Sequence, residues 1–168
     1  MSRFLLATLI LIMASASGFA ADKLPAPQEA VVLTIEGSIA KSNTADGKAQ
    51  FDFKMLKDLG VRSFKTKTPW IEGISEFNGV RMSGLMKAVG ATGQYIEAFA
   101  ADGYSNEVPI QDFETYNVLL VIFMNGRMLE NEDKGPLWIV YPFDAHPEID
   151  IDDKSAHAVW QLTRIVVK

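Results

Sequence analysis

The stretch from Val118 to Met124, VLLVIFM, is the most apolar run of the chain beyond residues 1–21. It is rich in β-branched side chains, and its seven residues are fewer than a typical globular helix contains. Asn125-Gly126 follows at once, and this dipeptide is typical of a tight turn. The run therefore predicts a buried strand.

Six further segments are predicted to be strands, because they are apolar or β-branched and end at glycine, proline or a polar turn. One pair of them flanks Asp102-Gly103, which is the pattern of a β-hairpin. The six segments are Val31–Glu36, Phe64–Thr68, Tyr95–Ala100, Tyr104–Pro109, Leu137–Tyr141 and Gln161–Val167.

Two or three short helices are expected between these strands. Asp52 can cap a helix over Phe53 to Leu59, because its side-chain oxygen would accept the free amide hydrogens of the first turn. A second helix follows Ser83 and ends at Gly90. Since the helices do not alternate regularly with the strands, the pattern predicts an α+β domain rather than a parallel doubly wound sheet.

The N-terminal segment has the layout of a secretory signal peptide. Arg3 precedes the uninterrupted apolar run Phe4–Met13, and small residues dominate Ala14–Ala21. A membrane anchor is the alternative, but the run is shorter than the roughly 20 residues that span a bilayer. We expect a signal peptide over residues 1–21, export to the periplasm, and one domain over residues 22–168.

The charge of the exported part narrows the range of partners. Without Arg3, 15 basic and 21 acidic residues remain, which gives a net charge of −6. No basic patch is visible in the sequence, so nucleic acid and anionic membranes are unfavourable partners. The chain has no cysteine, which excludes disulfides and a lipidated N-terminal cysteine.

An ordered series of short motifs between Val32 and Val140 resembles the molybdopterin-binding domain of sulfite-oxidase-type enzymes. It is most similar to a small exported subgroup described as pterin-binding proteins. The resemblance implies a fold of layered, mixed β-sheets with a few short helices, and a pterin as the class of ligand. The motifs are Thr68-Pro69-Trp70, Gly73, Phe77-Asn78-Gly79-Val80, Val89-Gly90-Ala91, Ala101-Asp102-Gly103-Tyr104, Val108-Pro109, Asp112, Asn125-Gly126, Gly135-Pro136-Leu137 and Val140-Tyr141-Pro142.

The chain departs from this family in two ways. The enzymes hold molybdenum through a cysteine thiolate, and by position the missing ligand falls within Phe64 to Trp70. The enzymes also place basic residues on the cofactor phosphate, whereas only Arg164 is cationic between Val159 and Arg164. We therefore expect a reduced, neopterin-like pterin without metal or phosphate, and no catalytic residues.

A pterin is a flat bicyclic ring whose guanidine-like edge donates two parallel hydrogen bonds. Its pocket needs aromatic walls for stacking and a few convergent polar groups, such as a carboxylate or a hydroxyl. Trp138 is expected in the core, and Asp102 also suits a turn beside glycine. The candidate ligand-binding residues are Trp70, Trp160, Tyr104, Thr68, Glu72, Asp102 and Tyr141.

No metal site is predicted. His146 and His157 lack the cysteines of a typical zinc set, although histidine with carboxylates stays open. The acidic stretch Glu148–Asp153 contains no glycine for the tight turn of a calcium loop, so it is predicted to be a solvated loop.

The leading hypothesis is a periplasmic, non-catalytic pterin-binding protein. It would act as a sensor component that relays pterin binding to the periplasmic domain of a membrane signalling protein. That partner would be a diguanylate cyclase, a phosphodiesterase or a kinase, and the output would be cyclic-di-GMP and biofilm control. A molybdopterin-dependent oxidoreductase subunit and a ligand-free envelope interaction domain are the alternatives.

Overall fold

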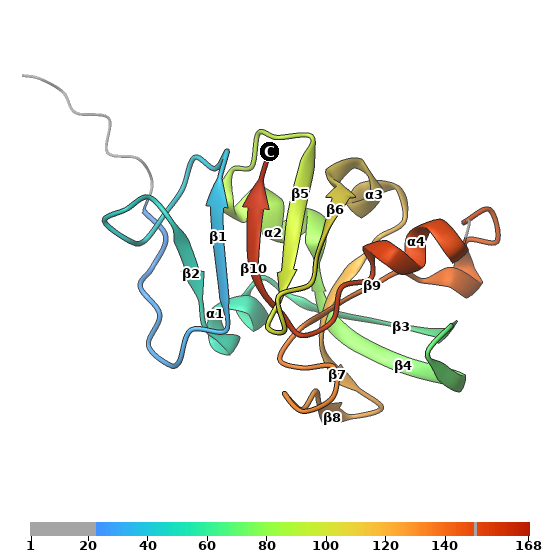
Figure 1. The fold of residues 1–168 in the computed structure, drawn as a ribbon. Coiled ribbons are helices and arrows are strands. Elements are labelled where there is room, and N and C mark those ends of the chain that lie inside the picture. The colour runs from blue at the N-terminus through green and yellow to red at the C-terminus, as the bar shows by residue number, and fades with distance from the viewer. Residues whose placement is uncertain (1–22, 150) are drawn as a thin grey trace, which may run out of the picture.

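The computed structural model describes residues 23–149 and 151–168. These residues form an α+β domain of ten strands in two sheets, with four short α-helices (Figure 1). None of the helices in this part of the chain has the length and apolar character needed to cross a bilayer. The predicted signal peptide, residues 1–21, lies outside the described residues.

The first sheet contains the first and the last strand of the chain that the structure describes. Its parallel central pair joins the first strand to the last one, and the remaining neighbours are antiparallel. In spatial order its strands are β2 (Ala49–Phe51), β1 (Leu33–Gly37), β10 (Leu162–Val167), β5 (Tyr95–Ala100) and β6 (Ser105–Pro109).

The second sheet is antiparallel and is formed by the middle of the chain. β7 lies at its centre and pairs with three strands. In spatial order the strands are β3 (Val61–Thr68), β4 (Ile71–Arg81), β7 (Leu119–Met124) and β8 (Arg127–Met128), and β9 (Trp138–Val140) also pairs with β7.

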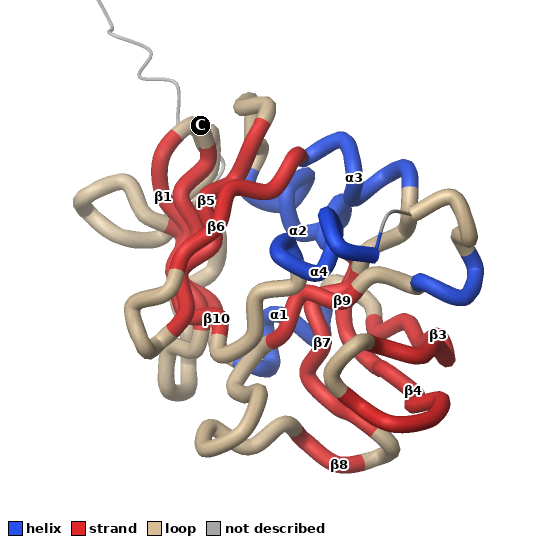
Figure 2. Tube along the Cα trace, turned by 45° about the vertical axis from the view of Figure 1, so that its right-hand side comes forward, coloured by secondary structure: helices blue, strands red, loops and turns tan. Residues whose placement is uncertain are grey.

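The helices connect strands and lie beside the first sheet, and Figure 2 shows all but the first of them above the second sheet. They are α1 (Phe53–Asp58), α2 (Met82–Val89), α3 (Ile110–Thr115) and α4 (Ile151–His157), with a 3-10 turn, η1, at Phe143–Ala145.

Strand β7 is buried on both faces, which explains the uninterrupted apolar run of its sequence. Leu120 and Ile122 point into the main core, which lies between the two sheets and holds the inner faces of α1, α2 and α3. Leu119 and Val121 point the other way, into a second and smaller cluster that contains Trp138. The second sheet therefore has a core on each face.

The local predictions for the first two helices are confirmed. Asp52 accepts a hydrogen bond from the Met55 amide at 2.8 Å and so caps α1. Gly90 ends α2 in the left-handed conformation, with φ of +62°.

Other elements differ from the sequence-based prediction. The acidic stretch Glu148–Asp153 was predicted to be a loop, but α4 begins at Ile151. Acidic residues in its first turn interact favourably with the positive end of the helix dipole, which a composition argument overlooks. Four further elements were not predicted: β2, β4, β8 and α3.

Candidate functional site

All three tryptophans of the chain lie together. Trp70 is in the β3–β4 turn, Trp138 is on β9, and Trp160 lies two residues before the start of β10. The Trp70 ring centroid lies 5.4 Å from that of Trp160 and 5.7 Å from that of Trp138, in edge-to-face arrangements that aromatic quadrupoles favour. Trp138 is fully buried, as predicted, whereas the other two indoles are half-buried and reach the surface.

Beside the two half-buried indoles is a cleft of about 430 Å³. Four of the seven predicted ligand-binding residues line it, namely Trp70, Asp102, Tyr104 and Trp160. The remaining lining residues are small: Ala100, Ser155, Ala156 and Ala158. Two other hollows, of about 480 and 640 Å³, are lined by described residues that include neither tryptophan nor tyrosine.

The β5–β6 turn forms one wall of the cleft. Gly103 has φ of +93°, and the Asp102 carboxylate accepts a hydrogen bond from the Tyr104 amide at 2.9 Å. Asp102 therefore shapes the turn and lines the cleft at the same time. The Tyr104 side chain is 49 % exposed, so its ring is available to a ligand.

Helix α4 and the residues just after it form the opposite wall, through Ser155, Ala156 and Ala158. The helix lies beside β6, as Figure 1 shows. Asn106 Nδ2 of β6 donates to the carbonyl oxygen of Ala156 at 2.7 Å. The backbone of the helix is thereby tied to the sheet at the cleft.

The lining of the cleft carries negative charge. Asp102 is the one charged side chain among the described residues that line it. Lys134 does not line the cleft. Its ammonium lies 5.1 Å from the Trp160 ring centroid and pairs with Asp133 at 3.1 Å. The cleft thus favours a flat ligand that is neutral or cationic and carries hydrogen-bond donors.

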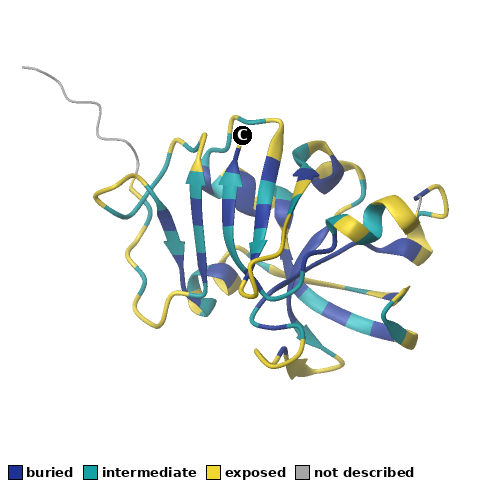
Figure 3. Ribbon diagram, in the orientation of Figure 1, coloured by how far each residue is buried: buried dark blue, intermediate teal, exposed yellow. Residues whose placement is uncertain are grey.

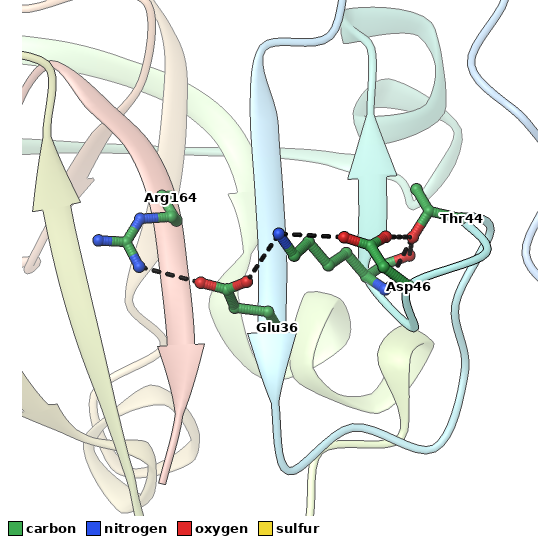
Figure 4. A network of polar contacts seen from close by, with 5 residues as sticks. Glu36, Thr44, Asp46 and Arg164 are labelled. Atoms are coloured by element: carbon green, nitrogen blue, oxygen red, sulfur yellow. Dashed lines mark hydrogen bonds and ion pairs between the residues drawn. The ribbon is translucent and has the colours of Figure 1, made fainter.

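Arg164, the one cation considered for a cofactor phosphate, is engaged elsewhere. Its guanidinium donates to Glu36 at 3.0 Å and lies 3.6 Å from the centre of the Phe99 ring. Figure 4 shows it in a chain of charges that continues through Glu36 to Lys48 and Asp46. It belongs to the first sheet and is not among the residues that line the cleft.

The structure does not bring the other three predicted residues to the cleft lining. Tyr141 is fully buried, and its hydroxyl donates to Asp112 at 2.9 Å, while burial raises its pKa. Glu72 is exposed on β4. Thr68 lies at the end of β3, and its buried hydroxyl oxygen has no hydrogen-bond partner among the described residues.

The small residues of the α4 wall were missed by the sequence argument. Ser155, Ala156 and Ala158 carry no chemistry that a pattern could detect, and their segment follows the stretch predicted to be a loop. Their small size is the one feature that could have indicated a binding site, because small side chains leave space for a ligand opposite an aromatic wall.

Residues 28–144 match the sequence model of the oxidoreductase molybdopterin-binding domain family. The chain belongs to this family. Among curated protein sequences none matches it.

The fold is similar to that of a solved sulfane dehydrogenase, SoxCD from Paracoccus pantotrophus, with a TM-score of 0.60 and 19 % sequence identity. The superposition covers 80 % of this chain and 37 % of that one, so this chain spans well under half the length of that relative. The predicted layered α+β fold is confirmed.

The residues present can be tested against the cofactor that the family name implies. The chain has no cysteine to supply a thiolate. Within the described residues, no group of three or more histidine, aspartate or glutamate side chains could hold a metal ion. The cleft offers a carboxylate where a phosphate would need a cation. Among the described residues, the lining of the cleft has aromatic surfaces for a flat ring and no cation for a phosphate or thiolate for a metal.

Proposed function

We propose that this chain is a non-catalytic pterin-binding protein that holds a reduced, neopterin-like pterin between Trp70, Tyr104 and Trp160. The proposal rests on one observation: two indoles, a phenol ring and one carboxylate line the same cleft. Its volume of about 430 Å³ lies within the usual range for small-ligand sites, and aromatic walls with a few polar groups are typical of them.

Each lining group has a role in this proposal. The indoles of Trp70 and Trp160 contact the bicyclic ring, and the Asp102 carboxylate accepts the paired donors of its guanidine-like edge. Ser155 and Tyr104 supply the two hydroxyl groups of the lining. A pterin without phosphate fits this lining, because no cation is required.

The cellular setting extends this proposal. The chain is exported to the periplasm and reports pterin binding to the periplasmic domain of a membrane signalling protein. That partner is a diguanylate cyclase, a phosphodiesterase or a kinase, so pterin binding controls cyclic-di-GMP and biofilm formation. The support is the pattern of residues 1–21 and the absence of a cysteine thiolate from a chain of this family.

Titration of the purified protein with neopterin and its dihydro and tetrahydro forms tests binding. Because all three tryptophans lie in one cluster, a ligand in the cleft should quench most of their emission. It should also raise the melting temperature, as any ligand of the native state does. Unchanged emission and melting temperature at high micromolar pterin would rule out the proposal.

Family membership favours a second candidate, a molybdopterin-dependent oxidoreductase subunit. Metal analysis of protein purified from a molybdenum-replete host separates the two. Stoichiometric molybdenum would support the enzyme, and a bound fluorescent pterin without molybdenum would support the binding protein. A tightly bound protein partner without any small molecule would instead support an envelope interaction domain.

A further inference from the structure

Helix α4 forms a wall of the cleft but contributes nothing to the core. None of the residues from Ile151 to His157 is buried, and Figure 3 shows the helix in the colours of exposed and intermediate residues. Burial of an amphipathic face normally supplies most of the stability of a short helix in a protein. Polar contacts should therefore contribute much of what holds α4 in place.

Besides the hydrogen bond from Asn106 to Ala156, α4 has a charged contact with Asp112 of α3. Its Oδ2 atom lies 3.0 Å from the Lys154 ammonium and accepts the Tyr141 hydroxyl at 2.9 Å. His157 Nδ1 lies 3.8 Å from the same oxygen. The side chains of Asp112, Lys154 and His157 are only 12 to 15 % exposed, so this cluster is largely shielded from water.

Lys154 has a second carboxylate partner, Asp153, at 3.1 Å. The Asp153 side chain is 59 % exposed, and exposed ion pairs contribute little. Removing one partner of a largely shielded pair is costly, because the remaining charge is left in that environment without compensation. Burial of Lys154 opposes its charged form, yet the two carboxylates outweigh this effect and raise its pKa.

We propose that Asp112 is a positioning residue for the cleft: it anchors α4 through Lys154 and thereby sets the separation between the Ser155–Ala156 wall and the tryptophan wall. The proposal rests on the proposed function for its ligand, although the anchoring itself does not require one. Asp112 does not line the cleft, so its effect on a ligand is exerted through α4.

Two variants that affect the same ammonium provide the test. Asp112→Asn removes the buried carboxylate charge, and the matched control Asp153→Asn removes the exposed one. Hydrogen exchange of residues 151–160 in the full protein without ligand should be at least tenfold faster in Asp112→Asn. In Asp153→Asn it should be no more than about threefold faster, because that variant removes an exposed charge from the first turn of α4. Exchange in β7 should be unchanged in both.

The second part of the test measures the neopterin affinity of the same variants by titration. Asp112→Asn should bind about tenfold more weakly, Asp112→Glu should recover part of this loss, and Asp153→Asn should bind as wild type does. The double variant Asp112→Asn/Lys154→Gln should be no worse than Asp112→Asn alone, because the two residues act through each other.

Three results would overturn the anchoring role: unchanged exchange in α4 of Asp112→Asn, equally accelerated exchange in β7, or an equal effect of Asp153→Asn. If wild type itself binds no pterin while α4 exchange rises only in Asp112→Asn, the pterin function fails and the anchor stands.

Discussion

Thr66 lies within Phe64–Trp70, the stretch in which the resemblance to the enzymes predicts the missing thiolate. Its fully buried hydroxyl donates to the Lys67 carbonyl at 3.1 Å and accepts from the Asp144 amide at 2.9 Å. The Asp144 carboxylate in return accepts the Lys67 amide at 2.9 Å. This reciprocal pair fixes β3 to η1, so the Thr66 oxygen is committed to structure.

Substitutions of Asp102 and Trp160 test the binding proposal most directly. Trp160→Ala removes a stacking surface, so neopterin affinity should fall about tenfold. Asp102→Asn replaces a carboxylate that accepts two donors by an amide that can accept only through one oxygen, and a loss of about tenfold is expected. Fluorescence titration or calorimetry measures both.

Glu72→Gln is the matched carboxylate control, because Glu72 is exposed outside the cleft lining. Its affinity should stay within twofold of wild type. If Glu72→Gln weakens binding as much as Asp102→Asn does, the ligand does not occupy the cleft between Trp70 and Trp160.

At the scale of the elements, the sequence predicts the caps and turns that depend on interactions between neighbouring residues. The Asp52 cap, the Gly90 stop and the Asp102-Gly103 hairpin all followed from neighbouring residues. Strand β4 was missed because it contains Gly79, which usually interrupts a strand. A Cβ at that position would lie 2.0 Å from the Leu120 carbonyl oxygen, so the close approach of β7 requires glycine there. No local pattern contains that information.

Asp52 gives a prediction for α1. Its buried carboxylate accepts the amides of Met55 and, at 2.8 and 3.1 Å, those of Gln28 and Glu29. Asp52→Ala should therefore lower the free energy of unfolding at neutral pH by about 2 kcal/mol, the upper end for a helix cap. Urea denaturation measures the change.

The pH dependence follows from the same contacts. The Met55 amide, with Gln28 and Glu29, lowers the pKa of Asp52 below its usual 3.8 despite burial. The stabilisation is therefore present above pH 3.8 and is lost as the pH falls through the lower, folded-state pKa. The difference between wild type and Asp52→Ala should shrink in that range. A difference that stays constant with pH would contradict a contribution from the ionised carboxylate.

His157 gives a pH prediction for α4. Here the folded state disfavours the charged form of the side chain, whereas for Asp52 it favours the charged form. Burial first, and then the nearby Lys154 cation, lower its pKa below 6.5, although Asp153 and Asp112 act in the opposite direction. The folded protein therefore resists protonation of this ring, and stability should decline as the pH falls below 6.5 through the folded-state pKa.

The neutral variant His157→Gln should reduce this decline. Hydrogen exchange of residues 151–160 at several pH values, compared with exchange in β7, locates the effect in α4. Equal pH dependence in wild type and His157→Gln would show that another group is responsible.

At the scale of the whole molecule, the cleft joins segments that are far apart in sequence. Trp70, Asp102, Tyr104 and Trp160 come from the β3–β4 turn, the β5–β6 turn and the approach to β10. Residue chemistry could select them as candidates, but only the packing of the two sheets places them together. The same packing withdraws Tyr141 into the core, since alternate residues of β9 and its extension face opposite cores.

The two cores can be separated experimentally, because adjacent leucines of β7 face opposite ways. Leu119 belongs to the cluster of Trp138, and Leu120 belongs to the main core between the sheets.

Leu119→Ala and Leu120→Ala should each lower the free energy of unfolding by about 2–5 kcal/mol, the usual cost of a cavity in a core. Only Leu119→Ala should shift the native tryptophan emission and weaken pterin binding, because its cavity forms in the cluster that contains Trp138 and against which Trp70 and Trp160 pack. Urea denaturation, emission spectra and neopterin titration of both variants test this expectation. Equal changes of emission in both variants would show that the two faces of the second sheet are not independent cores.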